Sequence, residues 1–178
     1  DYMAGQRFQP KTEVSAAEFQ TVLFDTRIMR RLNPTGSGPG QNGSAAMDGD
    51  PATFWLAGSA PRGQSGTRHP HELTITFPEP AAMSGLVLMP RQNDRDHLGD
   101  VRGYTIQVTD DGQAWREVAR GELPSSWSPQ RVMFAQSTKA KQLKFTALRG
   151  YGNDGTAAIA ELAVIYAGPA LSGDVSGP

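Results

Sequence analysis

Residues 45–55 read Ala45-Ala46-Met47-Asp48-Gly49-Asp50-Pro51-Ala52-Thr53-Phe54-Trp55. This stretch places two carboxylates, a glycine and a hydroxyl side by side, ahead of an aromatic pair. Hard cations such as Ca²⁺ bind carboxylate and backbone carbonyl oxygens together. Because Gly49 adopts backbone angles that other residues resist, a tight turn here can aim several oxygens at one point. The stretch therefore suggests a structural metal site.

The composition excludes several classes of protein. The chain has 178 residues and no cysteine, so it forms no disulfide, thiolate metal site or cysteine nucleophile. Its net charge of −1 provides no field of one sign for nucleic acid or an anionic membrane. No apolar run approaches the ~18 residues of a membrane span, so membrane insertion is not expected. The 20 glycines and 13 prolines indicate many turns and short strands.

Beyond Trp55 the apolar residues alternate with polar ones, which is the period of half-buried strands. No helical pattern interrupts these segments. We therefore predict an all-β protein, an antiparallel β-sandwich or jelly roll, with Trp55 and Trp115 in its core. The predicted strands are 71–77, 85–90, 104–109, 114–119, 131–135, 142–148 and 160–166.

The two ends of the chain differ from this pattern. Residues 1–26 form an N-terminal extension, in which Ser15-Ala16-Ala17-Glu18 fits a capping box and predicts a short helix. The pattern from Phe19 to Leu32 is ambiguous, and the alternation over 27–32 could be a strand. The sandwich is expected over 27–168. The Gly- and Pro-containing residues 169–178 read as a linker or tail, which suggests a unit from a larger protein.

Four long loops are expected at one pole of the sandwich. If successive strands reverse direction, loops 56–70, 91–101, 120–129 and 149–158 meet there. Loops held on a rigid scaffold often carry binding residues. The cationic, hydrogen-bonding and aromatic residues of these loops are Arg62, Arg68, His69, Arg91, Asn93, Arg95, Asp96, His97, Trp127 and Tyr151.

Five motifs in order resemble one known family. They are residues 45–55, 70–75, 85–92, 104–115 and 160–162, the last reading Ala-Glu-Leu. Together they resemble the discoidin domain, also called the coagulation factor five/eight C-type domain, over about residues 27–167. Within that family the chain is most similar to family 32 carbohydrate-binding modules of bacterial glycan-degrading enzymes. The resemblance implies a galactose-binding-domain-like jelly roll with one structural Ca²⁺.

The resemblance also implies the ligands of that ion. They are the carbonyl of Ala45, the carboxylates of Asp48 and Asp50, the carbonyl and hydroxyl of Thr53, the carbonyl of Ala160 and the carboxylate of Glu161. Such a site would join the first loop to the last strand. The alternative is that Asp48-Gly49-Asp50 is only an Asx turn.

The sugar site of the family maps onto the loop pole. Arg91 matches the arginine that binds ligand hydroxyls, whereas Asp96 and His97 stand where the family commonly has Asn-Gly. Arg91 could instead pair with a loop carboxylate and be structural. Tyr151, and next Trp127, are candidates for the aromatic platform, and Arg68 or His69 could replace the family's histidine. His71, at a strand start, is expected to be structural, and a zinc site with His69 lacks a third ligand.

These expectations favour a non-catalytic carbohydrate-binding module. It would target a parent glycan-active enzyme or surface protein to galactoside-type or charged glycans, as a secreted, cell-surface or periplasmic monomer. A structural or protein-interaction domain that packs on a neighbouring catalytic domain is the alternative. An enzyme is not expected, because the loop aspartates lack a visible pocket to raise their pKa and no Ser/His/Asp order stands out.

Overall fold

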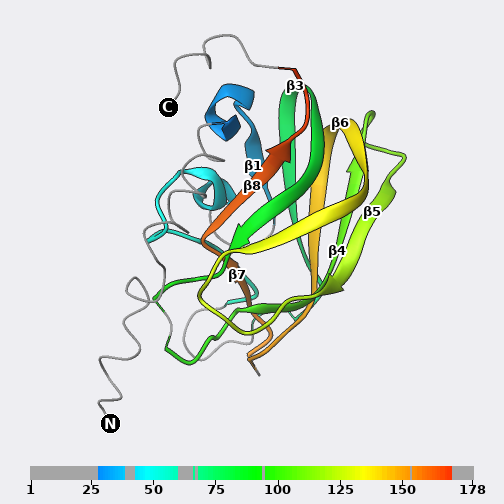
Figure 1. Ribbon diagram of the computed structural model, residues 1–178. Helices are drawn as coiled ribbons and strands as arrows, with labels where there is room; N and C mark the ends of the chain where they lie inside the picture. The colour runs from blue at the N-terminus through cyan, green and yellow to red at the C-terminus, as the bar shows by residue number, and fades with distance from the viewer. Residues whose placement is uncertain are drawn as a thin grey trace.

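The computed structural model describes residues 28–38, 43–59, 66, 68–93, 95–152 and 154–169 (Figure 1). The predicted N-terminal extension 1–26, Arg62 and most of the tail lie outside these residues. The elements in chain order are β1 (Thr35–Ser37), the 3₁₀ helix η1 (Gly43–Met47), β2 (Trp55–Ala57), β3 (His71–Met89), β4 (Val101–Thr109), β5 (Arg116–Glu122), β6 (Gln130–Gly150), β7 (Ala157–Ile159) and β8 (Glu161–Tyr166).

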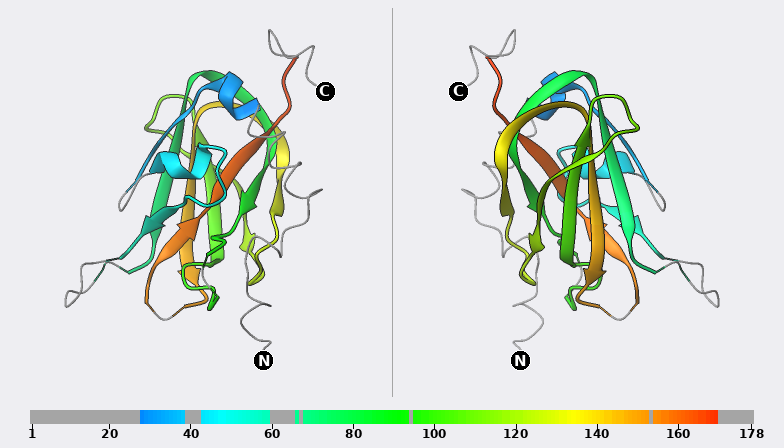
Figure 2. Two further views of the ribbon diagram at one scale, coloured as in Figure 1. Left: turned by 90° about the vertical axis from the view of Figure 1, so that its left-hand side faces the viewer. Right: turned by 90° about the vertical axis from the view of Figure 1, so that its right-hand side faces the viewer.

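The architecture is an antiparallel β-sandwich, as predicted. The larger sheet has the order β1-β3-β6-β4-β5, and β8 pairs with β3; β2 and β7 form a second, two-stranded sheet. Strands β3 and β6 arch from one layer to the other (Figure 2). Their first and second halves therefore belong to opposite layers of the sandwich.

This continuity corrects the expectation of separate short strands. Segments 71–77 and 85–90 fall almost entirely within β3, and 131–135 and 142–148 belong to β6. The β3–β6 pairing shifts register between Thr76 and Ala81 and again between Met83 and Gly85. Pro78 and Pro80 stand in the first irregularity, where the absent N–H groups cost no ladder hydrogen bond. The alternation fails at the bend, although the chain stays extended.

Residues 28–32 are helical, so the strand suggested for this segment is wrong. Met29 is buried, and its sulfur accepts a hydrogen bond from the Val164 amide at 3.4 Å. Ile28 and Leu32 lie on the same side of the helix, whereas the arginines between them are exposed. Asn33 ends the helix with φ 52°, and its N–H donates to the Met29 carbonyl at 2.8 Å.

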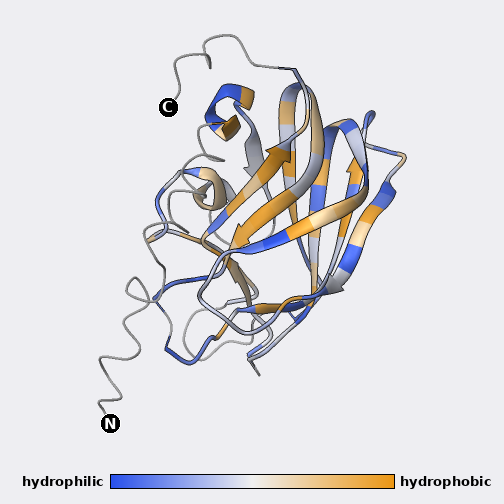
Figure 3. Ribbon diagram, viewed as in Figure 1, coloured by the Kyte–Doolittle hydropathy of each residue, from blue (hydrophilic) through white to orange (hydrophobic). Residues whose placement is uncertain are grey.

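The core lies between the two layers, and hydrophobic residues recur along the strands of both (Figure 3). Tyr104 and Phe145 stack within it, with ring centroids 5.8 Å apart. Trp55 is fully buried, as expected. Trp115 is not a core residue: it precedes the edge strand β5, is half-buried, and has the Lys144 Nζ 4.1 Å from its ring centroid.

The described parts of the four loops gather at one pole, as strand direction predicted. Hydrogen bonds connect three of them: the Tyr151 N–H donates to the Asp100 carbonyl at 3.1 Å, and the Leu123 N–H donates to the Arg102 carbonyl at 2.8 Å. Residues 68–69 of the fourth loop lie against Gly150 and Gly155. Within the described ranges, no helix has both the length and the apolar character needed to cross a bilayer.

Replacing Phe145 by alanine should reduce the free energy of unfolding by about 3–5 kcal/mol, because a fully buried aromatic ring is lost and a cavity remains. Urea denaturation measures this change. Leu148→Ala on the same strand is the matched control: Leu148 is 40% exposed, so its loss should cost about 0.5 kcal/mol or less. Equal losses in the two variants would contradict the assigned strand faces.

Candidate functional site

Arg91 lies just past the end of β3, at the loop pole. Its Nε donates to the Asn93 Oδ1 at 2.6 Å, and its guanidinium carbon lies 4.4 Å from the centre of the Phe54 ring. The side chain is half-buried. Asp94, a carboxylate of the same loop that could pair with Arg91, is outside the described residues. The guanidinium is therefore held between a loop amide and an aromatic face.

Gln92 fixes the neighbouring loop. Its side chain is buried, and its Nε2 donates to the carbonyls of Pro90 at 2.8 Å and Trp127 at 2.7 Å. These two bonds tie the loop before β6 to the end of β3. Gln92 lies in the 85–92 motif, but its sequence position alone does not indicate this role.

His97 and Trp127 form a stacked pair, with ring centroids 4.3 Å apart and planes inclined by 26°. The His97 Nδ1 is 2.8 Å from the Asp100 Oδ2, and the Asp100 side chain is buried. His97 has φ 59°, a backbone conformation that few residues other than glycine adopt. A buried carboxylate thus orients the imidazole, which in turn supports the indole.

Asp96, a predicted ligand contact, lies beside an arginine of its own loop. Its Oδ1 lies 3.4 Å from the Arg95 Nε, and both side chains are about two-thirds exposed, at 65% and 66%. An exposed pair of this kind contributes little to stability. Asp96 therefore belongs to the rim of the site, and the adjacent His97 is the residue that joins its centre.

The Tyr151 side chain is 39% exposed, and both its hydroxyl and its ring have contacts that hold it in place. Its hydroxyl donates to the Leu123 carbonyl, and the Arg102 guanidinium carbon lies 5.6 Å from its ring centre. Arg102 and Arg149 both contact Glu122. The hydrogen bond from Arg149, followed by that from Arg102, holds the pKa of Glu122 below its usual value. Arg102 was not among the predicted site residues, although its place at the start of β4 puts it at this pole.

Arg68, His69 and His71 lie on the segment that leads into β3. The His71 Nε2 is 2.6 Å from the Gly155 carbonyl oxygen, which supports the structural role expected of it. The His69 and His71 ring centroids are 4.8 Å apart, and the His69 Nε2 is buried with no hydrogen-bond partner among the described residues. Arg68 is exposed and lies against Gly155. The structure places these residues beside loop 151–156.

Glu161 is buried at the start of β8, and its Oε2 has no hydrogen-bond partner in the described part of the chain. Its Oε1 accepts from the Gly49 N–H at 3.2 Å, across 112 positions of sequence. Burial, and then the hydrogen bond and charge of Asp48, raise its pKa to about 9; the charge of Asp50 adds to this shift, and the Gly49 N–H opposes it. The predicted turn and the last strand are therefore brought together.

The turn is also stabilised by its own hydrogen bonds. The Asp48 Oδ1 accepts from the Asp50 N–H at 2.9 Å, and its Oδ2 accepts from the Thr53 hydroxyl. The Asp50 Oδ1 accepts from the Ala52 N–H at 2.9 Å. The described ranges contain no group of three or more His, Cys, Asp or Glu side chains arranged to hold a metal ion. Asp48 and Asp50 therefore each form an Asx turn, as the alternative to a metal site predicted for this segment.

The donor set nevertheless suits a hard cation. Every expected ligand is an oxygen, and three of the six residues contribute backbone carbonyls, which Ca²⁺ accepts readily. A buried carboxylate oxygen without a partner is unfavourable unless a cation or a proton neutralises it. Ala45 in η1 and Ala160, the residue before Glu161, are both buried. The residues present therefore fit a divalent cation.

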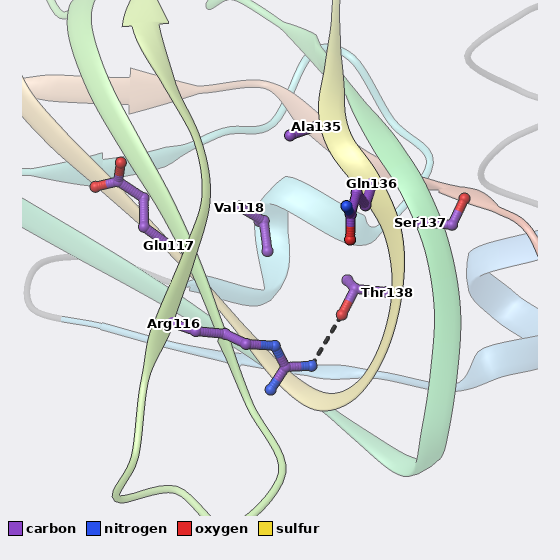
Figure 4. A pocket seen from close by; sticks show the side chains of 7 residues that line it. All are labelled: Arg116, Glu117, Val118, Ala135, Gln136, Ser137 and Thr138. Carbon is purple, nitrogen blue, oxygen red and sulfur yellow. Dashed lines mark hydrogen bonds between the residues drawn. The ribbon is translucent and has the colours of Figure 1, made fainter.

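A separate hollow of about 190 Å³ lies between β5 and the bend of β6, away from the loop pole (Figure 4). The Arg116 Nη2 donates to the Thr138 hydroxyl at 2.8 Å and to the Lys139 carbonyl at 3.3 Å. None of the predicted ligand residues lines this hollow. Its lining residues are Arg116, Glu117, Val118, Ala135, Gln136, Ser137 and Thr138.

The model of the F5/8 type C domain matches residues 32–162. The chain belongs to the F5/8 type C domain family. Among solved structures, this F5/8 type C domain is similar to the family 32 carbohydrate-binding module of Clostridium perfringens NanJ in complex with galactose. The two share 26% identity with a TM-score of 0.64, over 75% of this chain and 94% of that one.

Two further Clostridium perfringens structures share the fold. A family 32 module in complex with GalNAc-β-1,3-galactose is 24% identical, with a TM-score of 0.65 over 76% of this chain and 96% of that one. A module from a family 31 glycoside hydrolase is 26% identical, with a TM-score of 0.62 over 75% of this chain and 88% of that one. The resemblance predicted from the motifs is confirmed.

The stability of the domain should fall in mildly acidic solution because of His69. Burial, and then the charge of His71, lower the pKa of His69 below 6.5, while Asp154 opposes this shift. Below about pH 6.5 the unfolded chain therefore binds more protons at this position than the folded one, and folding stability is lost as pH falls through the lowered pKa. Urea denaturation at pH 7.5 and pH 5 should show a smaller loss for His69→Asn than for the wild type. Equal losses would contradict this assignment.

Proposed function

We propose that this F5/8 type C domain is a non-catalytic carbohydrate-binding module. The observation that carries the proposal is the grouping of a guanidinium and partly exposed aromatic rings on loops at one pole of a rigid sandwich. Arg91 supplies charged donors for sugar oxygens, and Trp127 and Tyr151 supply apolar ring surface for sugar C–H groups. Its likeness to a galactose-bound module at 26% identity supports the same function.

The ligand class we propose is a galactoside-type or charged sugar. The described pole carries Arg68, Arg91, Arg95 and Arg102, of which Arg95 and Arg102 lie beside carboxylates. Planar guanidinium groups bind both hydroxyl oxygens and carboxylates. The described residues of the site lie on the surfaces of several loops, and we expect binding to be weak and confined to one or a few sugar units.

In the cell, such a module would hold a larger glycan-active enzyme or surface protein close to its substrate. The similar module from a family 31 glycoside hydrolase supports this accessory role. Its partners would be glycans and the neighbouring domains of the same chain. We place the protein outside the cytoplasm, secreted, at the cell surface or in the periplasm, where such glycans occur.

We also propose a structural Ca²⁺ at the turn between η1 and β2. The carbonyls of Ala45, Thr53 and Ala160, the Thr53 hydroxyl, and the carboxylates of Asp48, Asp50 and Glu161 would hold it. The ion would supply a positive charge next to the buried Glu161 carboxylate, which has no cationic partner among the described residues. It would tie the turn to β8 and so order one edge of the loop pole.

A glycan array followed by calorimetry tests the sugar site. The wild type should bind at least one of the galactosides, uronates or amino sugars, and Arg91→Ala should weaken that binding at least tenfold, because a charged hydrogen bond contributes about 1.5–3 kcal/mol. Arg120→Ala is the matched control, since Arg120 is exposed on the edge strand β5 and pairs with Glu117. Binding of no glycan would instead favour a domain that packs on a neighbouring catalytic domain.

Chelation tests the metal site. Removing a divalent ion bound at about 100 times its Kd should cost about 2.7 kcal/mol and lower the melting temperature by about 5–10 °C. Added Ca²⁺ should restore the melting temperature, and elemental analysis should find calcium in the purified protein. Glu161→Gln should make the melting temperature insensitive to chelator, because the neutral amide needs no counter-charge. An unchanged melting temperature in the wild type, with no metal found, would overturn the calcium proposal.

A further inference from the structure

We propose that Phe54 is a positioning residue for Arg91: its ring holds the guanidinium in the orientation that binds sugar. This inference rests on the proposed sugar site and goes beyond it, because Phe54 belongs neither to the metal ligands nor to the sugar contacts considered above. It lies directly between Thr53, which closes the Asp48 turn, and the fully buried Trp55.

Phe54 has a fixed place on the outer face of the sandwich. Its neighbour Trp55 enters the core, whereas Phe54 packs against a separate small cluster of Val87, Met89 and Ala160. The first two of these residues belong to β3 and the third precedes β8. The ring is only half-buried, so one part of it rests on this cluster and another part meets Arg91.

Met89, one of the residues on which Phe54 packs, lies just before Arg91 in the chain. Met89 is paired with Glu161 in the β3–β8 register, and the Ala160 N–H donates to the Met89 carbonyl at 2.9 Å. Arg91 follows only two residues later. Phe54 therefore rests on the same residues that anchor the start of the Arg91 loop, so the ring and the guanidinium share one support.

The contact constrains the guanidinium in a specific way. The Arg91 guanidinium carbon is 4.4 Å from the ring centre, within the range of a cation–π interaction. The bond from its Nε to Asn93 at 2.6 Å fixes rotation about the end of the side chain. Because guanidinium donors lie in its plane, an aromatic ring over one face leaves hydrogen bonding to the edge. Two contacts thus restrict a long side chain that would otherwise lose much entropy on binding.

The contact between Phe54 and Arg91 can be tested by NMR spectroscopy without any sugar present. In a ¹H–¹⁵N spectrum, ring current should shift the Arg91 side-chain protons of the wild type upfield. Phe54→Leu should remove this shift, since leucine fills much of the volume without an aromatic face, and Phe54→Tyr should retain it. The melting temperature of each variant reports separately on folding. An Arg91 spectrum unchanged by Phe54→Leu would overturn the proposed contact.

A double-mutant cycle tests the consequence for binding, using galactose, N-acetylgalactosamine and galacturonic acid as probes. Phe54→Leu should weaken the binding shown by the wild type about two- to fivefold, and Phe54→Tyr should preserve it. In an Arg91→Lys background, Phe54→Leu should cause little additional loss, because the ring acts through the guanidinium.

The outcomes separate the two proposals. If the wild type binds none of the probes or the arrayed glycans, the proposed function fails while the spectrum still decides the contact. If the wild type binds and Phe54→Leu leaves affinity unchanged, or lowers it equally in both backgrounds, the positioning role fails and the sugar site stands. Loss of affinity only with Arg91 present supports the positioning role.

Discussion

The pairing of β3 with β6 is the constraint on which the rest of the molecule depends. Both strands run up one layer, cross the far end and return down the other, so all four of their ends lie at the same pole. Each candidate binding loop begins or ends at one of these ends: 68–70 before β3, 90–100 after it, 123–129 before β6 and 151–156 after it. The β3–β6 pairing therefore positions the loops of this pole. The β3–β8 pairing in turn positions Glu161, which binds the turn at Gly49.

The sequence pattern identified the longer strands, but it missed the three-residue strands β1, β2 and β7 and the continuity of β3 and β6. Alternation identifies which residues of a segment face the core, because the side-chain period of a strand is two. It says nothing across Pro78-Glu79-Pro80, where pairing is interrupted although the strand goes on. Over 28–32 a few residues fit a strand and a helix equally well, and the helix found there contacts the distant Val164 through Met29. Contacts of this kind, between residues far apart in the sequence, are not visible in a local pattern.

In the candidate site too, the positions of the loops could be predicted from the sequence, whereas the side-chain contacts could not. Strand direction alone predicted that Arg91, Trp127 and Tyr151 share a pole, because it depends only on counting reversals. It could not predict how their side chains are held, since this depends on residues from other loops: Phe54 beneath Arg91, and the Gln92 side chain on the Trp127 carbonyl. The contact of Asp96 with Arg95 was not predictable either, because a loop position does not reveal which neighbour a carboxylate faces.

Glu161 raises the question of why a carboxylate is buried where the fold could bury an apolar residue. One of its oxygens has no partner, and burial and then Asp48 raise its pKa to about 9, which disfavours the ionised form when no cation is present. A neutral acid shares at most one proton with Asp48, which links two side chains. A divalent ion would instead draw Asp48, Glu161 and nearby carbonyls to one point, and these belong to η1, the turn and β8. Only the second arrangement uses the charge that the sequence places there, and it would fix Thr53 and hence the adjoining ring of Phe54.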